Sequence, residues 1–164
     1  MLTPTRAISI AAVLALSAAV AIPALTSAQT VGAREIAVLE KVRAATFVHA
    51  KRSTRGERLR PGDRVLTRQA LFAADGSAVG MLFTDCANVG RAAEVFKATL
   101  QCVSTYRFKD GEVVSAGVAV LSAGGTIRFP IVGGSGAYRG AHGEVTSGKP
   151  AKGYQSSDAL HLNG

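Results

Sequence analysis

The sequence predicts an all-β fold, an eight-stranded antiparallel β-barrel, and three observations support this prediction. Short β-leaning runs recur at fairly regular intervals, with little helical spacing after the first 28 residues. Turn sequences with glycine separate these runs, most clearly at 75–77, 110–111 and 124–125, where glycine supplies the positive φ that tight hairpin turns require. A sandwich remains the alternative, but closing eight strands into a barrel removes the exposed edges that invite aggregation.

The N-terminal segment has the pattern of a secretion signal. Arg6 supplies a basic start, residues 7–25 form an almost unbroken apolar run, and small residues follow at 26–28. We expect residues 1–28 to be a signal peptide, cleaved after Ala28. The alternative is an uncleaved membrane anchor, although the run is rich in alanine and interrupted by a proline. The prediction is a secreted, extracellular protein with no membrane span after cleavage.

Residues 29–164 are predicted to form a single domain, because their number suits one hydrophobic core. Without the signal peptide the chain has 18 basic and 11 acidic side chains, and the excess lies between Lys41 and Arg68. Such a basic stripe can attract nucleic acid or an anionic envelope polymer. However, no aromatic side chain lies between His49 and Arg68 to stack on bases. We therefore expect no nucleic-acid partner and a solvated loop at 52–62.

The expected strands are taken here in chain order. They cover residues 35–49, 64–73, 78–85, 95–108, 112–121, 126–132, 143–147 and 157–162. Apolar side chains alternate at Val79, Met81 and Phe83, as in a strand with one buried face. The run 112–121 is apolar on both faces. In the first run, residues 36–42 also fit one helical stripe, so a short helix there is an open alternative. An eight-stranded barrel has an interior about large enough for one small ligand.

Two cysteines occur, Cys86 and Cys102, so only one intramolecular pairing exists. An oxidising compartment would favour a disulfide, and closing that loop would contribute about 3 kcal/mol in the chain-entropy model. Two buried free thiols are the alternative.

A glycine-rich segment follows the sixth expected strand. Its five glycines are Gly133, Gly134, Gly136, Gly140 and Gly143. A dinucleotide-binding loop also has clustered glycines, but here no amphipathic helix follows and no acidic residue lies about 20 positions on. The segment instead predicts a structural turn in which the backbone packs closely against itself between two barrel strands.

Residues 129–143 read Phe-Pro-Ile-Val-Gly-Gly-Ser-Gly-Ala-Tyr-Arg-Gly-Ala-His-Gly. They resemble the Phe-Pro-Ile-Val-Gly-Gly-Thr-Gly signature, and its continuation to Arg-x-Ala-Arg-Gly, of plant dirigent proteins and the related allene oxide cyclase barrel family. Further pieces follow in the family's order: 61–63 before the second strand, the hairpin 71–80 and the turn 109–112. The cysteine pair is similar to that of secreted bacterial members. The resemblance extends loosely over residues 35–162.

This resemblance implies an eight-stranded antiparallel barrel around an apolar cavity, often in a homotrimer, but no single chemistry. Allene oxide cyclases convert an unstable fatty-acid epoxide into a cyclopentenone, whereas dirigent proteins orient reactive phenolic intermediates. This chain departs from the pattern at Met81, where relatives often have arginine, and at Thr84, where they often have glycine. Ser135 and His142 replace threonine and arginine in the signature. These departures weaken the transfer of a dirigent pocket.

Few side chains are candidates for chemistry. Asp85 is the candidate catalytic acid, because burial in an apolar barrel would raise its pKa, and a solvent-facing hairpin acid is the alternative. Tyr106 and Arg139 are candidates for binding a polar ligand group, the alternatives being core packing for Tyr106 and a Glu144 ion pair for Arg139. The histidines have no metal-ligand spacing, so we expect no metal and no cofactor. A hydrolase triad with His161 is not expected, because no strand-to-helix elbow presents a nucleophile.

Three functions are open at this point. The first is a secreted barrel that binds a small apolar or phenolic molecule in its interior. The second is a cyclase or isomerase of the allene oxide cyclase type, with Asp85 as the acid. The third is a non-catalytic envelope protein that binds anionic polymer through its basic segment.

Overall fold

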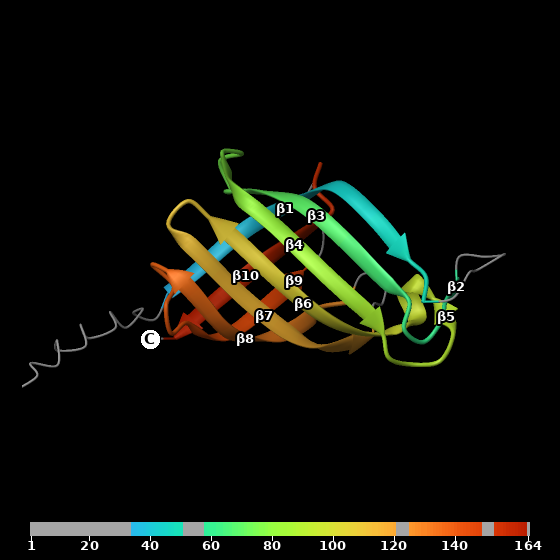
Figure 1. The fold of residues 1–164 in the computed structure, drawn as a ribbon. Coiled ribbons are helices and arrows are strands. Elements are labelled where there is room, and N and C mark those ends of the chain that lie inside the picture. Colours follow the sequence, from blue (N-terminus) through green and yellow to red (C-terminus); the bar gives the residue numbers. More distant parts are fainter. Residues whose placement is uncertain (1–33, 51–57, 121–124, 149–152, 164) are drawn as a thin grey trace, which may run out of the picture.

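The computed structural model describes residues 34–50, 58–120, 125–148 and 153–163. The expected signal peptide (1–28), most of the expected charged loop (51–57) and residue 124 of one expected turn lie outside the described residues. Eight strands form a closed antiparallel barrel in the order β1-β10-β9-β8-β7-β6-β4-β3 (Figure 1). They are β1 (Arg34–Val48), β3 (Arg64–Phe72), β4 (Ala78–Asn88), β6 (Thr99–Phe108), β7 (Gly111–Val120), β8 (Ile127–Gly136), β9 (His142–Gly148) and β10 (Ser156–Asn163).

The predicted all-β barrel is therefore confirmed, and each expected strand corresponds to one of these eight. Residues 36–42 belong to a continuous strand, so the helical alternative is wrong. Two features differ from the expectation. Residues Val95–Lys97 form a 3-10 turn (η1) in place of the start of β6, and β8 continues through the first glycines of the signature to Gly136. Within the described residues, no helix has the length and hydropathy needed to cross a membrane.

A small cap lies beside one end of the barrel, where β2 (Arg58–Leu59) pairs with β5 (Ala93–Glu94). Leu59 is 1% exposed and packs in an apolar cluster with the disulfide-bonded cysteines of β4 and β6. Ala98, directly after η1, is fully buried in the same cluster. The 3-10 turn thus carries the chain from the cap into β6 and directs Ala98 into this cluster.

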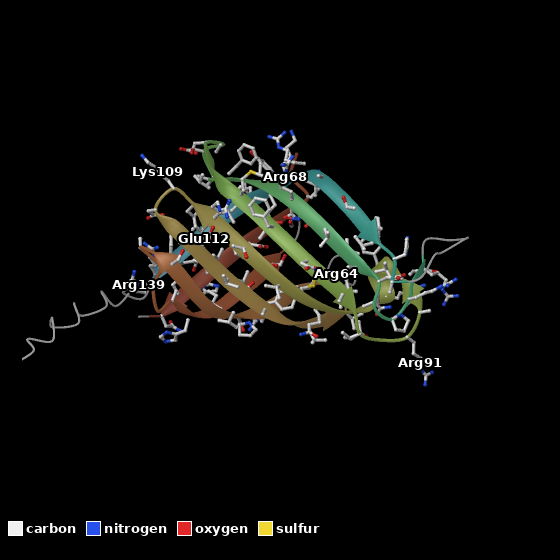
Figure 2. All side chains as sticks on the ribbon, in the orientation of Figure 1. Arg64, Arg68, Arg91, Lys109, Glu112 and Arg139 are labelled. Atoms are coloured by element: carbon white, nitrogen blue, oxygen red, sulfur yellow. A yellow bond between two sulfur atoms is a disulfide. The ribbon has the colours of Figure 1, made fainter. Side chains whose placement is uncertain are left out.

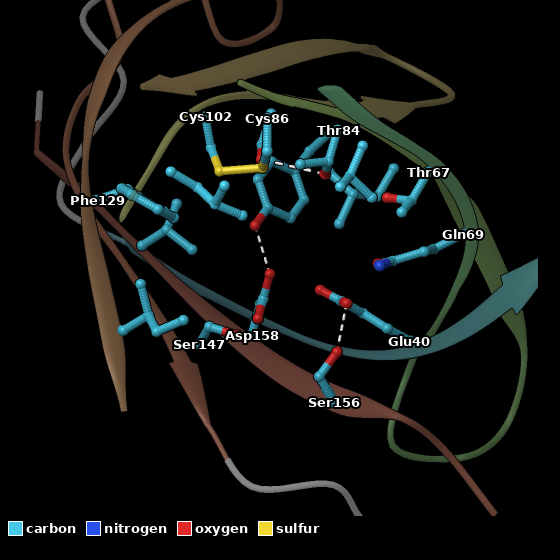
Figure 3. Close-up of a pocket in the computed structure, with 17 residues that line it drawn as sticks. Glu40, Thr67, Gln69, Thr84, Cys86, Cys102, Phe129, Ser147, Ser156 and Asp158 are labelled. Carbon is cyan, nitrogen blue, oxygen red and sulfur yellow. Dashed lines mark hydrogen bonds between the residues drawn. A yellow bond between two sulfur atoms is a disulfide. The ribbon is translucent and has the colours of Figure 1, made fainter. Parts of the chain in front are cut away.

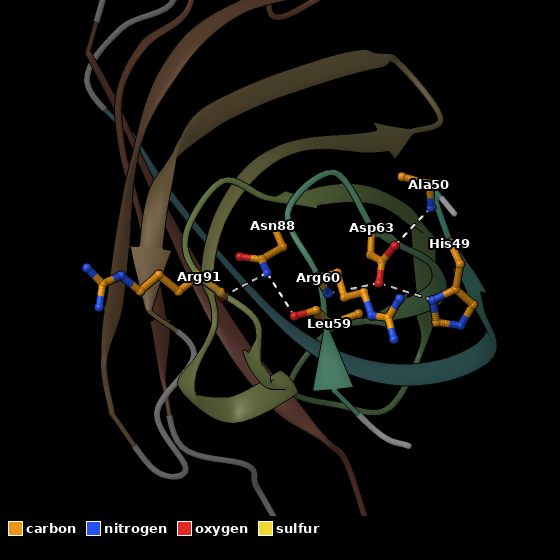
Figure 4. A network of polar contacts seen from close by, with 7 residues as sticks. All are labelled: His49, Ala50, Leu59, Arg60, Asp63, Asn88 and Arg91. Atoms are coloured by element: carbon orange, nitrogen blue, oxygen red, sulfur yellow. Dashed lines mark hydrogen bonds and ion pairs between the residues drawn. The ribbon is translucent and has the colours of Figure 1, made fainter. Parts of the chain in front are cut away.

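Two buried polar residues hold the cap in place (Figure 4). Asp63 accepts hydrogen bonds from the backbone N–H groups of Arg60 and Ala50, and its Oδ2 lies 3.1 Å from Nδ1 of His49. The Arg60 N–H, followed by His49, is the main reason that the pKa of Asp63 is lowered to about 2. Asn88 donates to the Leu59 and Arg91 carbonyls, so the cap's backbone groups are satisfied without water.

The opposite end of the barrel is filled by a larger apolar cluster. Its buried members are Val38, Leu71, Leu82, Tyr106, Val113, Ile131, Tyr138, Ala141, Val145, Leu160 and Leu162. Tyr138, from the glycine-rich turn, packs against Phe108, and the Arg34 guanidinium lies 4.5 Å from its ring centre. This end of the interior is therefore occupied by apolar side chains.

The glycine-rich segment makes the close backbone approach that the sequence predicts. Gly143 has φ +132°, and a Cβ atom there would lie 2.0 Å from the carbonyl oxygen of His161 on β10. Gly136 has φ +60°, and its Cβ would lie 2.3 Å from the Asp110 carbonyl oxygen. Any side chain at these positions would push β9 away from β10, or β8 away from the turn before β7.

We predict that Gly143→Ala destabilises the fold by about 3 kcal/mol, because the clash is with backbone and the φ is unfavourable for alanine. That loss corresponds to about 10 °C in the melting temperature. Gly133→Ala is the matched control, since nothing lies within 4 Å of a Cβ at Gly133. Thermal unfolding followed by circular dichroism measures both, and equal melting temperatures would contradict the prediction.

Candidate functional site

The barrel contains a cavity of about 210 Å³ that is lined in part by residues of both apolar clusters (Figure 3). An engineered apolar cavity of about 150 Å³ is enough to bind benzene, so this one has room for a one-ring molecule with a short substituent. Its lining comes from every barrel strand except β7. The lining residues are Glu40, Val65, Thr67, Gln69, Leu82, Thr84, Cys86, Leu100, Cys102, Ser104, Tyr106, Ile127, Phe129, Val145, Ser147, Ser156 and Asp158.

Strand alternation decides which side chains face this cavity, because successive residues of a strand point to opposite faces. Thr84 and Cys86 of β4 point inward, whereas Asp85 between them points outward. Cys102 lies directly opposite Cys86 on β6, and the predicted disulfide joins the two. The disulfide is therefore part of the cavity wall (Figure 3).

A buried group of polar side chains occupies one side of the cavity. Glu40 comes from β1, Ser156 and Asp158 from β10, and Tyr106 from β6. The Tyr106 hydroxyl donates to Oδ2 of Asp158, and the Ser156 hydroxyl donates to Oε2 of Glu40. Glu40 and Asp158 are 3% and 4% exposed, which is unusual for carboxyl groups that have no cationic partner.

The environment keeps Glu40 protonated at neutral pH. Desolvation by burial is the main cause that raises the pKa of Glu40 to about 9, and contact with the Asp158 carboxyl is the next. Glu40 therefore keeps its proton beside the Asp158 carboxyl group. Burial, together with the charge of Asp158, also raises the pKa of Tyr106, so its hydroxyl stays a hydrogen-bond donor.

Several oxygen atoms at this site lack a hydrogen-bond donor among the described residues. They include Oε1 of Glu40, Oδ1 of Asp158 and Oε1 of Gln69, all three from residues that line the cavity. The proton on Glu40 is available to the first two, because the two carboxyl groups interact. The Gln69 oxygen has no such donor. Buried acceptors left unpaired are unfavourable, so a hydrogen-bond donor that enters the cavity would be favoured beside these residues.

The sequence-predicted site residues lie in three different places. Asp85 faces solvent, which was the alternative interpretation of this residue, and pairs with Arg64 on the outside of the barrel. Tyr106 lies in the interior, 3% exposed, and contacts both the core and the two buried carboxyl groups of Glu40 and Asp158, called the acid pair below.

Arg139 is exposed in the glycine-rich turn, at the end of the barrel opposite the cap, and does not line the cavity. Its expected partner Glu144 lies 3.5 Å from Arg128 instead. Figure 2 shows Arg64 and Arg139 near opposite ends of the barrel.

The acid pair was not among the residues singled out from the sequence, although a signal for it exists. In β10, Asp158, Leu160 and Leu162 share the buried face, so an acid stands in an otherwise apolar inward row. In β1, Val38 and Glu40 do the same. What the sequence could not supply is the pairing of the first and last strands, which brings these rows together. Within the described residues, no three His, Cys, Asp or Glu side chains are grouped as metal ligands would be.

The structure defines a class of protein: closed eight-stranded antiparallel barrels with a small, partly polar cavity. Residues 44–159 match the family model of the allene oxide cyclase barrel like domain, and the chain belongs to this family. The resemblance noted in the glycine-rich segment is thereby confirmed. No curated protein sequence matches the chain.

Several solved structures share the fold. The chain is similar to a pyocyanin demethylase, with a TM-score of 0.64 and 18% identity over 79% of this chain and 100% of that one. It is similar to the exo-specific intermolecular Diels-Alderase AbnU, with a TM-score of 0.60 and 15% identity over 81% and 99%. The pterocarpan synthase dirigent protein PsPTS1 has a TM-score of 0.60 and 16% identity over 83% and 99%. At such identities the likeness concerns the fold alone.

We predict that Glu40 makes the fold less stable as pH rises. The folded protein keeps the Glu40 proton up to about pH 9, whereas the unfolded chain releases it near the ordinary value of 4.5, so unfolding releases a proton between these limits and becomes easier. Glu40→Gln removes this proton release. The variant should therefore gain stability relative to the wild type between pH 5 and 9 in urea denaturation. Glu144→Gln on the outer face is the control, and parallel curves for wild type and Glu40→Gln would refute the assignment.

Proposed function

We propose that the protein binds one small, largely apolar molecule in the interior of its barrel, through hydrogen bonds to the acid pair and Gln69. The observation that carries this proposal is the coexistence of a ligand-sized cavity with buried oxygen atoms, on residues of its wall, that have no hydrogen-bond partner among the described residues. A structural core would fill the space with apolar side chains or pair those oxygens. Most of the remaining wall is apolar, from residues such as Leu82, Phe129 and Val145, which suits a ligand body without charge.

A one-ring phenol tests this proposal, because its ring fits the cavity and its hydroxyl can bond to the unpaired acceptors. We expect 4-ethylphenol to bind in isothermal titration calorimetry. Ser147→Phe places a ring in the cavity and should weaken that binding by about ten-fold or more, since the space is lost. Thr146→Phe, the outward neighbour on β9, should bind like the wild type. Equal affinities for both variants would place the binding outside the barrel.

A second candidate function is acid catalysis of an isomerisation or cyclisation at the same site. Glu40 supports it, because a protonated carboxyl in a mostly apolar cavity can donate a proton to a bound oxygen atom and take it back. Asp158 would hold that proton in place, and Tyr106 would orient Asp158. Asp85 has no part in this role, because it lies outside the barrel.

Styrene oxide is a suitable probe of this second function, since protonation opens its strained ring and its size fits the cavity. We expect the wild type to accelerate its rearrangement or hydrolysis, as followed by NMR, and Glu40→Gln to lose at least about 100-fold of that acceleration. Asp85→Asn should retain the wild-type rate. A rate equal to that of buffer alone would argue for binding without acid catalysis of epoxides.

We further propose that the protein is exported. The Cys86–Cys102 disulfide supports this, because such bonds persist in oxidising compartments, and the N-terminal sequence has the signal pattern. Expression of the full sequence in a bacterial host, followed by mass spectrometry of the periplasm and medium, should find a chain beginning at Gln29. An intact chain confined to the cytoplasm would contradict export.

A further inference from the structure

The ionisable carboxyl groups of the cavity wall are not accompanied by basic side chains among the described lining residues. Two of its seventeen lining residues are acids, Glu40 and Asp158, and none is Lys, Arg or His. The basic side chains of the described barrel lie elsewhere: Arg64 pairs with Asp85 and Arg107 with Glu112, both on the outer face. Among the described residues, the charged side chains that line the cavity are therefore both acidic, and these two ion-paired arginines lie on the outer face of the barrel.

This arrangement leaves the buried acid pair without a cationic side chain among the described residues of the cavity wall. Burial is the main cause that raises the pKa of Glu40, and the hydrogen bond and the negative charge of Asp158 add to it. Hydrogen bonds from Tyr106 and Ser156 stabilise the pair, but neither group contributes a positive charge. A buried charge is costly unless it is paired, so a bound cation would be favoured, and a second anion would be strongly opposed.

We propose that the natural ligand of the cavity has a basic nitrogen, an amine or an aromatic nitrogen heterocycle, on a one-ring apolar body, and that it is bound in its protonated form. The inference rests on the proposed function and specifies its ligand class. The N–H⁺ group lies against the Glu40–Asp158 pair and donates to Oδ1 of Asp158, which has no other protein donor than the proton of the pair. Gln69 Oε1 accepts a second N–H bond.

The same geometry excludes ligands with a carboxylate or phosphate group. Such a group would lie within a cavity that holds a net negative charge and has no Arg or Lys in its wall, and like charges in a water-poor site repel strongly. A fatty-acid carboxylate could be accommodated only if its charged end stayed outside. The cavity therefore selects by charge as well as by size.

Three probes with one skeleton separate charge from shape: 2-phenylethylamine, 2-phenylethanol and phenylacetate. They are cationic, neutral and anionic at pH 7, and each has one ring and a short chain. In isothermal titration calorimetry we expect the amine to bind about ten-fold or more tightly than the alcohol, and phenylacetate to bind about ten-fold or more weakly than the alcohol. This comparison uses only the wild-type protein, so it does not depend on any variant folding.

The double variant Glu40→Gln, Asp158→Asn assigns the selectivity to the acid pair. It keeps the shape of both side chains and removes their charge, so the amine and the alcohol should bind with affinities within about three-fold of each other. The matched control is Glu144→Gln with Glu35→Gln, which removes two exposed carboxylates from β9 and β1. This control should keep the wild-type preference for the amine.

The outcomes distinguish the two levels of the proposal. Binding of the alcohol with equal or weaker binding of the amine would overturn the inference about charge and leave the small-molecule function intact. Tight amine binding that survives in the double variant, or is lost in the outer-face control, would also overturn it. Failure of all three probes to bind would overturn the proposed function and the inference with it.

Discussion

The pairing of the first barrel strand with the last is the interaction on which the rest of the structure depends. β1 pairs with β10 from Arg34 to Glu40, and Glu40 lies opposite Ser156. The same residue of β1 also lies opposite Leu71 of β3, so this short region closes the sheet into a tube. Without that closure the inward faces would be exposed to water. With it, residues 118 positions apart in the chain form one acid pair.

Closure of the barrel also depends on glycines, which have no side chain, at the positions where two backbones approach each other most closely. The backbone of β9 approaches that of β10 closely at Gly143, and the β8 end approaches the preceding hairpin turn at Gly136. Large side chains from Tyr138 and Phe108 then fill the interior at that end. The glycines and the aromatic rings are complementary: the former let the backbones meet, and the latter occupy the space behind them. The remaining cavity is consequently confined to the middle and the capped end.

Much of the fold was predictable from the sequence because a half-buried strand has a simple period. The alternation at Val79, Met81 and Phe83 locates β4 correctly, although the residues that actually face inward there are the intervening ones, such as Leu82 and Thr84. In a narrow barrel the outer face can be apolar too, and Phe83 is 37% exposed. Hydrophobicity alone therefore does not distinguish the two faces of this strand.

The site was less predictable than the fold because it depends on facts that are not local. Tyr106 was singled out from the sequence and lies in the interior, but its partner Asp158 could be recognised only once β6 and β10 were known to face each other across the tube. Asp85 was a candidate acid on the assumption that it faces the barrel interior, yet one step along a strand reverses the direction of a side chain. Residues 51–57, within the basic segment, lie outside the described part of the chain.

The position of the disulfide in the cavity wall has a consequence for the reduced chain. Cys86 and Cys102 would then be two thiols in the wall of the cavity. An electrophilic guest, such as a quinone methide or an epoxide, would alkylate these thiols. Formation of the disulfide therefore crosslinks the cavity wall and also removes its reactive thiols. An electrophilic guest could be held without reacting with these cysteines only when the disulfide is formed.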